Sequence, residues 1–142
     1  MDGYKHIEHS CGAFIASHYK NPVEIGVGNN LDAARCIHEA GCPVRAIDIR
    51  ECRLPSWLSF ARDDIFSPDL SLYKGADVLY ALRPAEEMIP ALISLAQVLD
   101  CDLVVYHLGF ESYGDGGSIV DCGVPLHYYN RRKSEPVQKS VD

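Results

Sequence analysis

The segment Val23-Glu24-Ile25-Gly26-Val27-Gly28-Asn29-Asn30 carries the clearest signal for ligand binding in this chain of 142 residues. A short apolar run ends there, and a helical pattern begins at Leu31. Such a turn leaves backbone N–H groups free at the start of the helix, and Gly26 and Gly28 have no side chain that would keep a ligand away. Asn30 stands where a third glycine often occurs, and asparagine tolerates a left-handed backbone. The segment therefore predicts a loop that binds a ligand through its main chain.

Asp48 is the second part of this signal, because it lies 22 residues after Gly26 (48 − 26). It is in the apolar run 44–49, which we interpret as the second strand, and a right-handed crossover places that strand beside the first. The carboxylate of Asp48 would then face the loop and could accept both hydroxyls of a ribose. A glycine turn with an acidic residue about 20 positions further on is typical of nucleotide-cofactor sites. The alternative is a tight strand–helix turn without a ligand.

Three kinds of ligand loop compete for this segment. A dinucleotide site favours a third glycine at the position of Leu31, whose side chain would crowd the helix against the strand. A phosphate-binding P-loop needs Gly-Lys-Ser/Thr, which is absent. The remaining interpretation is an E-x-G-x-G turn in which Glu24 precedes Gly26 by two residues. That form suits a ligand with an amino-acid part, since an ammonium group needs an acidic partner.

Three groups of residues resemble the first three motifs of class I S-adenosylmethionine-dependent methyltransferases: Glu24-Ile25-Gly26-Val27-Gly28, Asp48, and Asp63-Asp64-Ile65. This resemblance covers roughly residues 22–108. Three further segments resemble more closely a small uncharacterised archaeal protein family, which is methyltransferase-like in fold and has no established activity: 62–68, 73–77 and 80–87.

The resemblance implies S-adenosylmethionine as the cofactor. The cofactor-binding residues that it implies are Glu24, Gly26, Gly28, Asn29, Asn30, Asp48, Ile49, Asp63 and Asp64. Glu24 would bind the methionyl ammonium, and Gly26 and Gly28 would line the methionyl part and the sugar. Asp48 would hold the ribose hydroxyls, and Ile49 would pack on the adenine. Asp64, together with Asp63, would meet the adenine amino group, although a helix cap or an exposed turn would explain this pair equally well.

The chain departs from the family pattern after the expected fourth strand. Amino-methylating members carry a D/N-P-P-aromatic motif there, whereas this sequence has Leu82-Arg83-Pro84-Ala85. A guanidinium is a donor only, so Arg83 disfavours methylation of an amine and suits an anionic acceptor, such as a carboxylate or phosphate. The alternative is a surface pair of Arg83 with Glu86 or Glu87. His107 is a candidate general base or a satisfied core residue.

The predicted elements alternate between strands and helices, which is typical of parallel βαβ units. We expect an α/β, Rossmann-like three-layer sandwich, with a mostly parallel central sheet, helices on both faces and a C-terminal hairpin. The predicted helices are 4–19, 31–40 and 85–99, the strands are 23–27, 44–49, 60–62, 76–82 and 102–108, and the hairpin strands are 119–122 and 126–130. Residues 1–130 would form one domain, and residues 131–142 a polar, disordered tail.

The bulk properties limit the partners. A net charge of −7 argues against a nucleic-acid surface. The six cysteines form no C-x-x-C pair, and no apolar run approaches the roughly 20 residues that span a bilayer, so we expect a reduced, cytoplasmic protein without a metal. The predicted function is methyl transfer from S-adenosylmethionine to a small or anionic acceptor. The alternative is a non-catalytic sensor or subunit that binds S-adenosylmethionine or a nucleoside. Because little chain remains for a substrate cap, a protein partner or homodimer could close the site.

Overall fold

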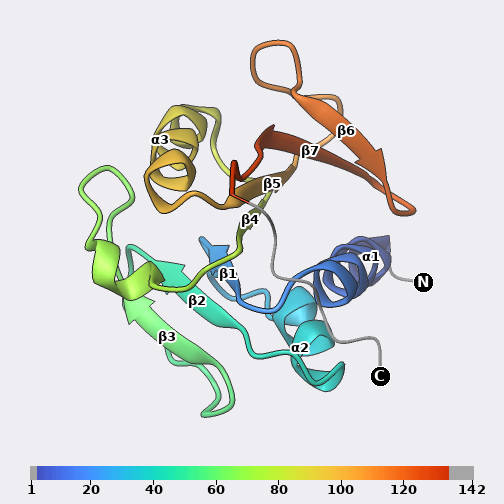
Figure 1. The fold of residues 1–142 in the computed structure, drawn as a ribbon. Helices are drawn as coiled ribbons and strands as arrows, with labels where there is room; N and C mark the ends of the chain where they lie inside the picture. Colours follow the sequence, from blue (N-terminus) through green and yellow to red (C-terminus); the bar gives the residue numbers. More distant parts are fainter. Residues whose placement is uncertain (1–2, 135–142) are drawn as a thin grey trace.

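One sheet of seven strands organises the chain, in the order β3-β2-β1-β4-β5-β7-β6 (Figure 1). It is seen in a computed structural model that describes residues 3–134. The strands are β1 (Pro22–Ile25), β2 (Arg45–Asp48), β3 (Ser59–Arg62), β4 (Val78–Leu82), β5 (Asp102–Tyr106), β6 (Ser118–Asp121) and β7 (Pro125–Asn130). Strands β1 to β5 pair in parallel, and β7 is antiparallel to both β5 and β6. The predicted mostly parallel sheet with a C-terminal hairpin is confirmed.

Helices cover both faces of this sheet. Figure 1 shows α1 (Gly3–His18) and α2 (Asp32–Glu39) on one side and α3 (Ile89–Leu99) on the other. The 3₁₀ turn η1 (Leu70–Tyr73) packs into the same apolar layer as α3, and η2 (Glu86–Met88) leads directly into α3. The predicted Rossmann-like three-layer fold is therefore confirmed. The helix expected at 85–99 begins as a 3₁₀ turn and becomes α-helical only at Ile89.

Helices α1 and α2 pack closely because Gly12 has no side chain. A Cβ atom built at Gly12 would lie 2.8 Å from the carbonyl oxygen of Ala33 and 2.8 Å from Cβ of Cys36. The close contact fixes which face of α1 is buried, and one turn before Gly12 that face carries Glu8, which is fully buried. The packing of two helices thus brings a charged side chain of α1 to the start of α2.

Strand β1 lies at the centre of the topology. It pairs in parallel with β2 on one side and with β4 on the other, so the order of the strands reverses between β1 and β4. Ligands of open α/β sheets bind at the carboxyl ends of the strands next to such a switch point. The glycine segment follows β1 directly, as its sequence predicts.

Besides the short β6–β7 turn, two connections between strands within residues 3–134 contain no helix, at 49–58 and at 107–117. The second is rich in glycine, and β7 holds it against the sheet. The hydroxyl of Tyr129 accepts a hydrogen bond from the backbone N–H of Tyr113 (2.9 Å), and His127 Nδ1 lies 2.8 Å from the carbonyl oxygen of Gly116.

The first residues of the expected tail are ordered. The backbone N–H of Arg132 donates to Asp102, and those of Lys133 and Ser134 donate to Asp100, over 2.7–3.2 Å. The prediction of disorder is therefore wrong for residues 131–134, because the amino ends of the strands offer carboxylates that bind this backbone. Residues 135–142, which the same prediction included, lie outside the described part of the chain.

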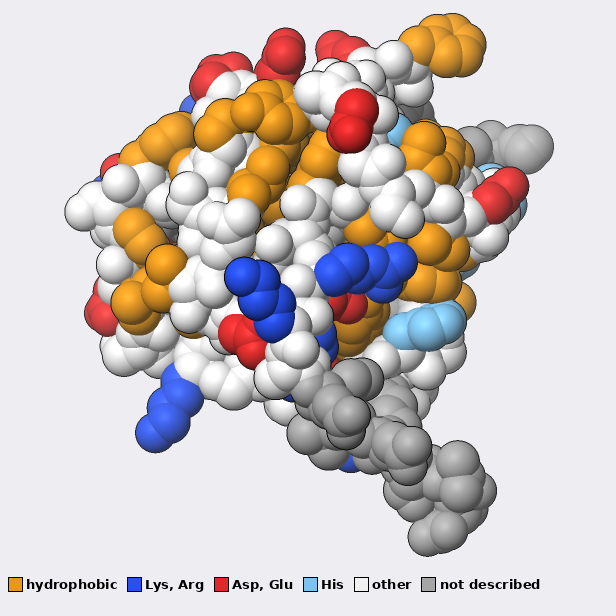
Figure 2. Space-filling view, turned by 45° about the horizontal axis from the view of Figure 1, so that its top comes forward, with side chains coloured by type: hydrophobic (Ala, Val, Ile, Leu, Met, Phe, Trp, Pro, Cys, Tyr) orange, Lys and Arg blue, Asp and Glu red, His pale blue; other side chains and the backbone are white. Residues whose placement is uncertain are grey.

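Across residues 3–134, no helix has both the length and the apolar character needed to cross a membrane. Figure 2 shows one face of the molecule, on which basic side chains stand among acidic ones near the centre. Hydrophobic side chains form several separate groups around them. Large apolar side chains that stay more than half exposed include Phe66 (61%) and Val98 (66%).

Candidate functional site

A cleft opens at the carboxyl ends of β1, β2 and β3, where the topology predicts a ligand site. Its volume is about 220 Å³. The residues that line it are Ile25, Gly26, Ile47, Asp48, Ile49, Asp63, Asp64, Ile65, Phe66 and Met88. Most of these side chains are apolar, and the polar ones are all carboxylates. Because whole small-molecule pockets start at roughly 300 Å³, the cleft is suited to one flat, apolar portion of a ligand rather than to all of it.

The glycine turn forms one wall of this cleft. Gly26 and Gly28 adopt left-handed φ angles of 76° and 53°, which glycine reaches without the strain that a Cβ atom would cause. The backbone N–H of Gly26 still donates to the carbonyl oxygen of Ile47 on β2 (2.8 Å), so the turn begins while it is tied to the sheet. The side chain of Asn30 then accepts from the N–H of Asp32 and satisfies a free donor at the start of α2.

Asp48 ends β2 and binds the glycine turn. Its Oδ2 accepts from the N–H of Gly28 (2.9 Å), and its Oδ1 accepts from the N–H of Arg50 (3.0 Å). A carboxylate offers about four acceptor positions, so each oxygen keeps one for a ligand. The next side chain, Ile49, also borders the cleft and is 56% exposed, so it offers an apolar surface to whatever enters.

Asp63 and Asp64 both line the cleft after β3, and both also stabilise the local chain. Asp63 accepts from the hydroxyl of Tyr73 (2.6 Å) and from the N–H of Asp69. Burial, together with this bond to Asp63, raises the pKa of Tyr73 above its usual range. Asp64 accepts from the N–H of Phe66 (2.9 Å) in a tight turn. The predicted ligand contact and the predicted turn are therefore compatible in Asp64, whereas Asp63 is held mainly by Tyr73.

Glu24 does not line the cleft. It is buried on the α1 side of the sheet, where its Oε1 accepts from the hydroxyl of Tyr80 (2.8 Å). Burial raises the pKa of Glu24 to about 8; the Tyr80 bond opposes this rise, and the nearby Glu8 carboxylate adds to it. Glu24 is therefore mostly protonated at neutral pH, which removes the negative charge that the predicted ammonium contact requires.

Glu8 is a site residue that the sequence interpretation missed. Its Oε2 accepts from Arg83 Nη1 (2.6 Å) and from Asn30 Nδ2 (3.0 Å). Burial alone would lower the pKa of Arg83, but the hydrogen bond and the charge of Glu8 hold it above its usual value. Arg83 thus has an ion-pair partner on α1 that neither interpretation of its sequence position had named. The signal was present in the sequence, because Glu8 falls on the helical stripe that also contains Cys11 and Ile15.

His107 is a buried residue rather than an open base. Its Nε2 lies 2.6 Å from the hydroxyl of Tyr129, and its ring meets that of His127 edge to face at 4.8 Å. Burial and the neighbouring His127 lower the pKa of His107, which favours its neutral form. All six cysteines are free, and within residues 3–134 no group of three or more His, Cys, Asp and Glu side chains has an arrangement that could hold a metal ion.

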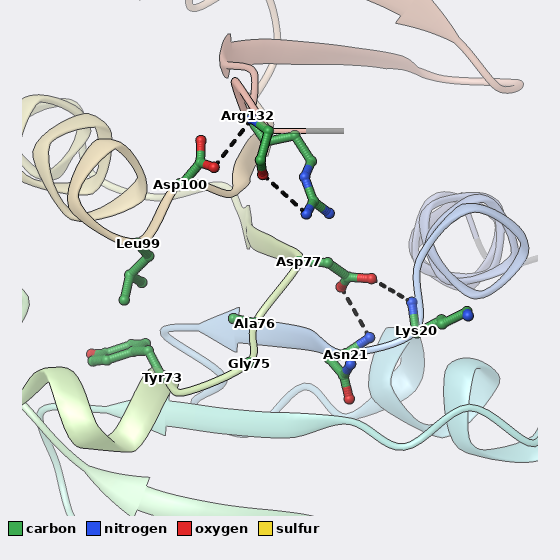
Figure 3. A pocket seen from close by; sticks show the side chains of 10 residues that line it. Lys20, Asn21, Tyr73, Gly75, Ala76, Asp77, Leu99, Asp100 and Arg132 are labelled. Carbon is green, nitrogen blue, oxygen red and sulfur yellow. Dashed lines mark hydrogen bonds between the residues drawn. The ribbon is translucent and has the colours of Figure 1, made fainter. Parts of the chain in front are cut away.

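A second pocket of about 320 Å³ lies at the opposite, amino edge of the sheet (Figure 3). Lys20, Asp77, Asp100 and Arg132 supply its charged side chains. Both oxygens of Asp77 accept backbone N–H groups, from Lys20 (2.6 Å) and from Asn21 (2.9 Å). None of the residues that the sequence predicts for the site lies at this pocket.

Two solved structures share the fold. Streptomyces venezuelae DesVI matches with a TM-score of 0.52 at 12% identity, over 80% of this chain and 58% of DesVI. The Burkholderia thailandensis 1,6-didemethyltoxoflavin-N1-methyltransferase, solved with 1,6-didemethyltoxoflavin and S-adenosylhomocysteine bound, matches with a TM-score of 0.50 at 15% identity. That match covers 89% of this chain and 62% of the enzyme. The chain spans less than two thirds of both neighbours, and at these identities the likeness shows the fold alone.

Sequence comparison finds nearer relatives among archaea. A UPF0146 protein of Halobacterium salinarum is 36% identical over 99 residues, which are 70% of this chain and 76% of the relative. One from Pyrococcus horikoshii is 34% identical over 114 residues, 74% of this chain and 84% of the relative. The profile of the Uncharacterised protein family (UPF0146) matches residues 9–115. The chain therefore belongs to the Uncharacterised protein family (UPF0146) and carries the fold of class I S-adenosylmethionine-dependent methyltransferases.

Proposed function

We propose that this protein binds S-adenosylmethionine at the carboxyl edge of the sheet and acts as a methyltransferase on a small or anionic acceptor. One observation carries the proposal. Gly26, Asp48 and Asp64 come from three separate segments, and they meet around one cleft with apolar walls at the switch point of the topology. Carboxylates beside an apolar slot match a nucleoside, which combines a flat ring with hydroxyl and amino donors.

The residues of the cleft fit the adenosine part of this cofactor. Asp48 keeps acceptor positions for the ribose hydroxyls, and Asp64 for the adenine amino group. Ile49 and Ile65 supply apolar walls for the ring and keep water from it. The cofactor, when bound, supplies an electrophilic methyl group on a sulfonium. The protein would contribute binding and alignment of the two reactants.

Titration calorimetry with S-adenosylmethionine and S-adenosylhomocysteine tests the proposal. We expect binding well below millimolar concentration, and Asp48→Ala should weaken it by about 1–3 kcal/mol, or about 5- to 150-fold, because the ribose hydroxyls lose their acceptor. Asp121→Ala is the matched control, since Asp121 also accepts a backbone N–H but lies at the β6–β7 turn. The proposal fails if neither ligand binds below millimolar concentration, or if both variants weaken binding equally.

A binder without turnover is the second candidate, and the Glu8–Arg83 pair favours it. Arg83 stands where amino-methylating relatives carry their acceptor motif, and an internal carboxylate holds it. Incubation with methyl-labelled S-adenosylmethionine and an archaeal cell extract separates the two candidates. Label that moves to an acceptor only when the active protein is present supports the enzyme. Tight cofactor binding without any transfer supports the sensor or subunit, whose site a partner protein or second copy would complete.

A further inference from the structure

The carboxylate of Glu8 is buried at the glycine turn with one oxygen unused. The residue is fully buried, and Oε2 binds both Arg83 and Asn30. Among the described residues 3–134, Oε1 has no hydrogen-bond partner. A buried acceptor without a donor costs free energy and is rare in folded proteins, unless a ligand or water supplies the donor.

The glycine turn connects this carboxylate to the cleft. Asp48 holds the turn at the N–H of Gly28, and Glu8 holds it at the side chain of Asn30. These two anchor points are two residues apart, so the backbone between them spans at most about 7 Å. A ligand whose ribose lies at Asp48 and whose chain follows the turn therefore runs toward Glu8.

Arg83 is held so that its guanidinium meets Glu8. Its backbone is left-handed (φ 55°), a conformation that costs a non-glycine residue energy and often marks functional positions. Its N–H donates to the carbonyl oxygen of Tyr106 (2.6 Å), and its guanidinium lies 5.3 Å from the centre of the Tyr106 ring. The side chain remains 20% exposed, so an anion can still reach it.

We propose that Glu8 and Arg83 form a subsite for the α-amino-acid end of the ligand, with Arg83 binding its carboxylate and Glu8 its ammonium. The subsite rests on the proposed function, and it makes Arg83 a group that recognises the cofactor rather than the methyl acceptor. An amino acid is a zwitterion, so its negative carboxylate matches the positive Arg83 and its positive ammonium matches the negative Glu8. Oε1 of Glu8 gains the donor that it lacks, and the ligand carboxylate gains a planar guanidinium.

The position of Glu24 supports this assignment independently. Glu24 is mostly uncharged at neutral pH. It lies on the α1 side of the sheet, where it is hydrogen-bonded to Tyr80. Glu8 comes from another segment and is already ion-paired beside the turn. The acidic residue that faces the amino-acid end would thus come from α1 rather than from β1.

The test compares two ligands that differ only in this end. S-adenosylhomocysteine carries the amino acid, and 5′-methylthioadenosine keeps the nucleoside and the thioether without it. In calorimetry we expect the wild-type chain to prefer S-adenosylhomocysteine by about 10- to 100-fold. Arg83→Gln should remove most of this preference and change the affinity for 5′-methylthioadenosine by less than about twofold. Arg131→Gln is the matched control, because Arg131 also lies over a tyrosine ring and near a carboxylate, but at Asp102, where β5 begins.

Arg83→Gln alone leaves Glu8 buried without its cation and could impair folding. The double variant Glu8→Gln/Arg83→Gln removes both charges, and we expect it to fold and to lose the same preference. If both ligands bind the wild type but the variants keep its preference, the subsite is overturned while the proposed cofactor site stands. If neither ligand binds the wild type, the proposed function fails, and the subsite fails with it.

Discussion

The two edges of the sheet use the same hydrogen-bond chemistry to different ends. At the carboxyl edge, Asp48 accepts two backbone N–H groups beside an apolar cleft. At the amino edge, Asp77 accepts two backbone N–H groups (Figure 3), and Asp100 accepts two more. The carboxylates of the amino edge join chain segments that are far apart in sequence, since Asp77 binds residues 20 and 21, and Asp100 binds residues 133 and 134.

The difference shows that a carboxylate at a strand end does not mark a ligand site by itself. At the amino edge, charged side chains of both signs line the pocket, and its carboxylates accept hydrogen bonds from backbone N–H groups. At the carboxyl edge the acids face Ile47, Ile49 and Ile65, and the main chain turns at Gly26 and Gly28 with no side chain in the way. Apolar walls together with an accessible backbone distinguish the site from the structural edge.

The largest expected effect concerns Glu24, which lies between the two edges and, unlike their carboxylates, is buried without backbone donors. Burial raises the pKa of Glu24 from its ordinary value of 4.5 to about 8. Unfolding therefore releases a proton between these values, and stability falls as the pH rises through this window. Glu24→Gln removes this dependence. The free energy of unfolding of the variant should therefore increase relative to that of the wild type as the pH rises, on the order of several kcal/mol in total.

Urea unfolding at pH 5, 7 and 8.5 measures this gain as a difference between variant and wild type, in which other titrating groups cancel. Glu39→Gln is the matched control, because it removes a carboxylate at the exposed end of α2. A difference for Glu24→Gln that does not change with pH would mean that Glu24 is ionised in the fold, and it would restore Glu24 as a partner for an ammonium.

The next largest effect separates the edges directly. Asp102 begins β5 at the amino edge and is buried, and it accepts from the hydroxyl of Tyr19 (2.6 Å) and from the N–H of Arg132 (2.8 Å). Asp102→Ala removes the acceptor of both hydrogen bonds and leaves the Tyr19 hydroxyl only its Tyr128 neighbour (2.8 Å), so it should lower the free energy of unfolding by about 2–3 kcal/mol. The affinity for S-adenosylhomocysteine should stay within about twofold of wild type. Loss of affinity in proportion to the loss of stability would show that the two edges are not independent.

The sequence was sufficient to predict the fold and the outline of the cleft. The apolar periods, the glycine turn and the spacing to Asp48 are local or depend on one βαβ unit, whose handedness is nearly invariant. The tertiary environment of charged residues was not predictable in the same way. Glu24 matches a motif but is neutralised by burial, and Arg83 pairs with Glu8, 75 residues earlier, rather than with its helical neighbours. Those outcomes depend on how α1 packs, and that packing rests on Gly12.

The smallest effect tests whether the backbone of the turn approaches the ligand. Gly28 and Gly41 both have left-handed φ angles, 53° and 84°, and a Cβ atom at either would meet no atom within 4 Å. Alanine at either position should cost about 1 kcal/mol of stability through backbone strain alone. Only Gly28→Ala should also weaken the binding of S-adenosylhomocysteine, because Gly41 lies at the end of α2, away from the cleft. Gly28→Asn sharpens the comparison, because asparagine tolerates this backbone conformation. The stability lost in Gly28→Ala should largely return in this variant, while the affinity for S-adenosylhomocysteine stays low. If Gly28→Asn binds as well as the wild type, the ligand does not lie against this part of the turn.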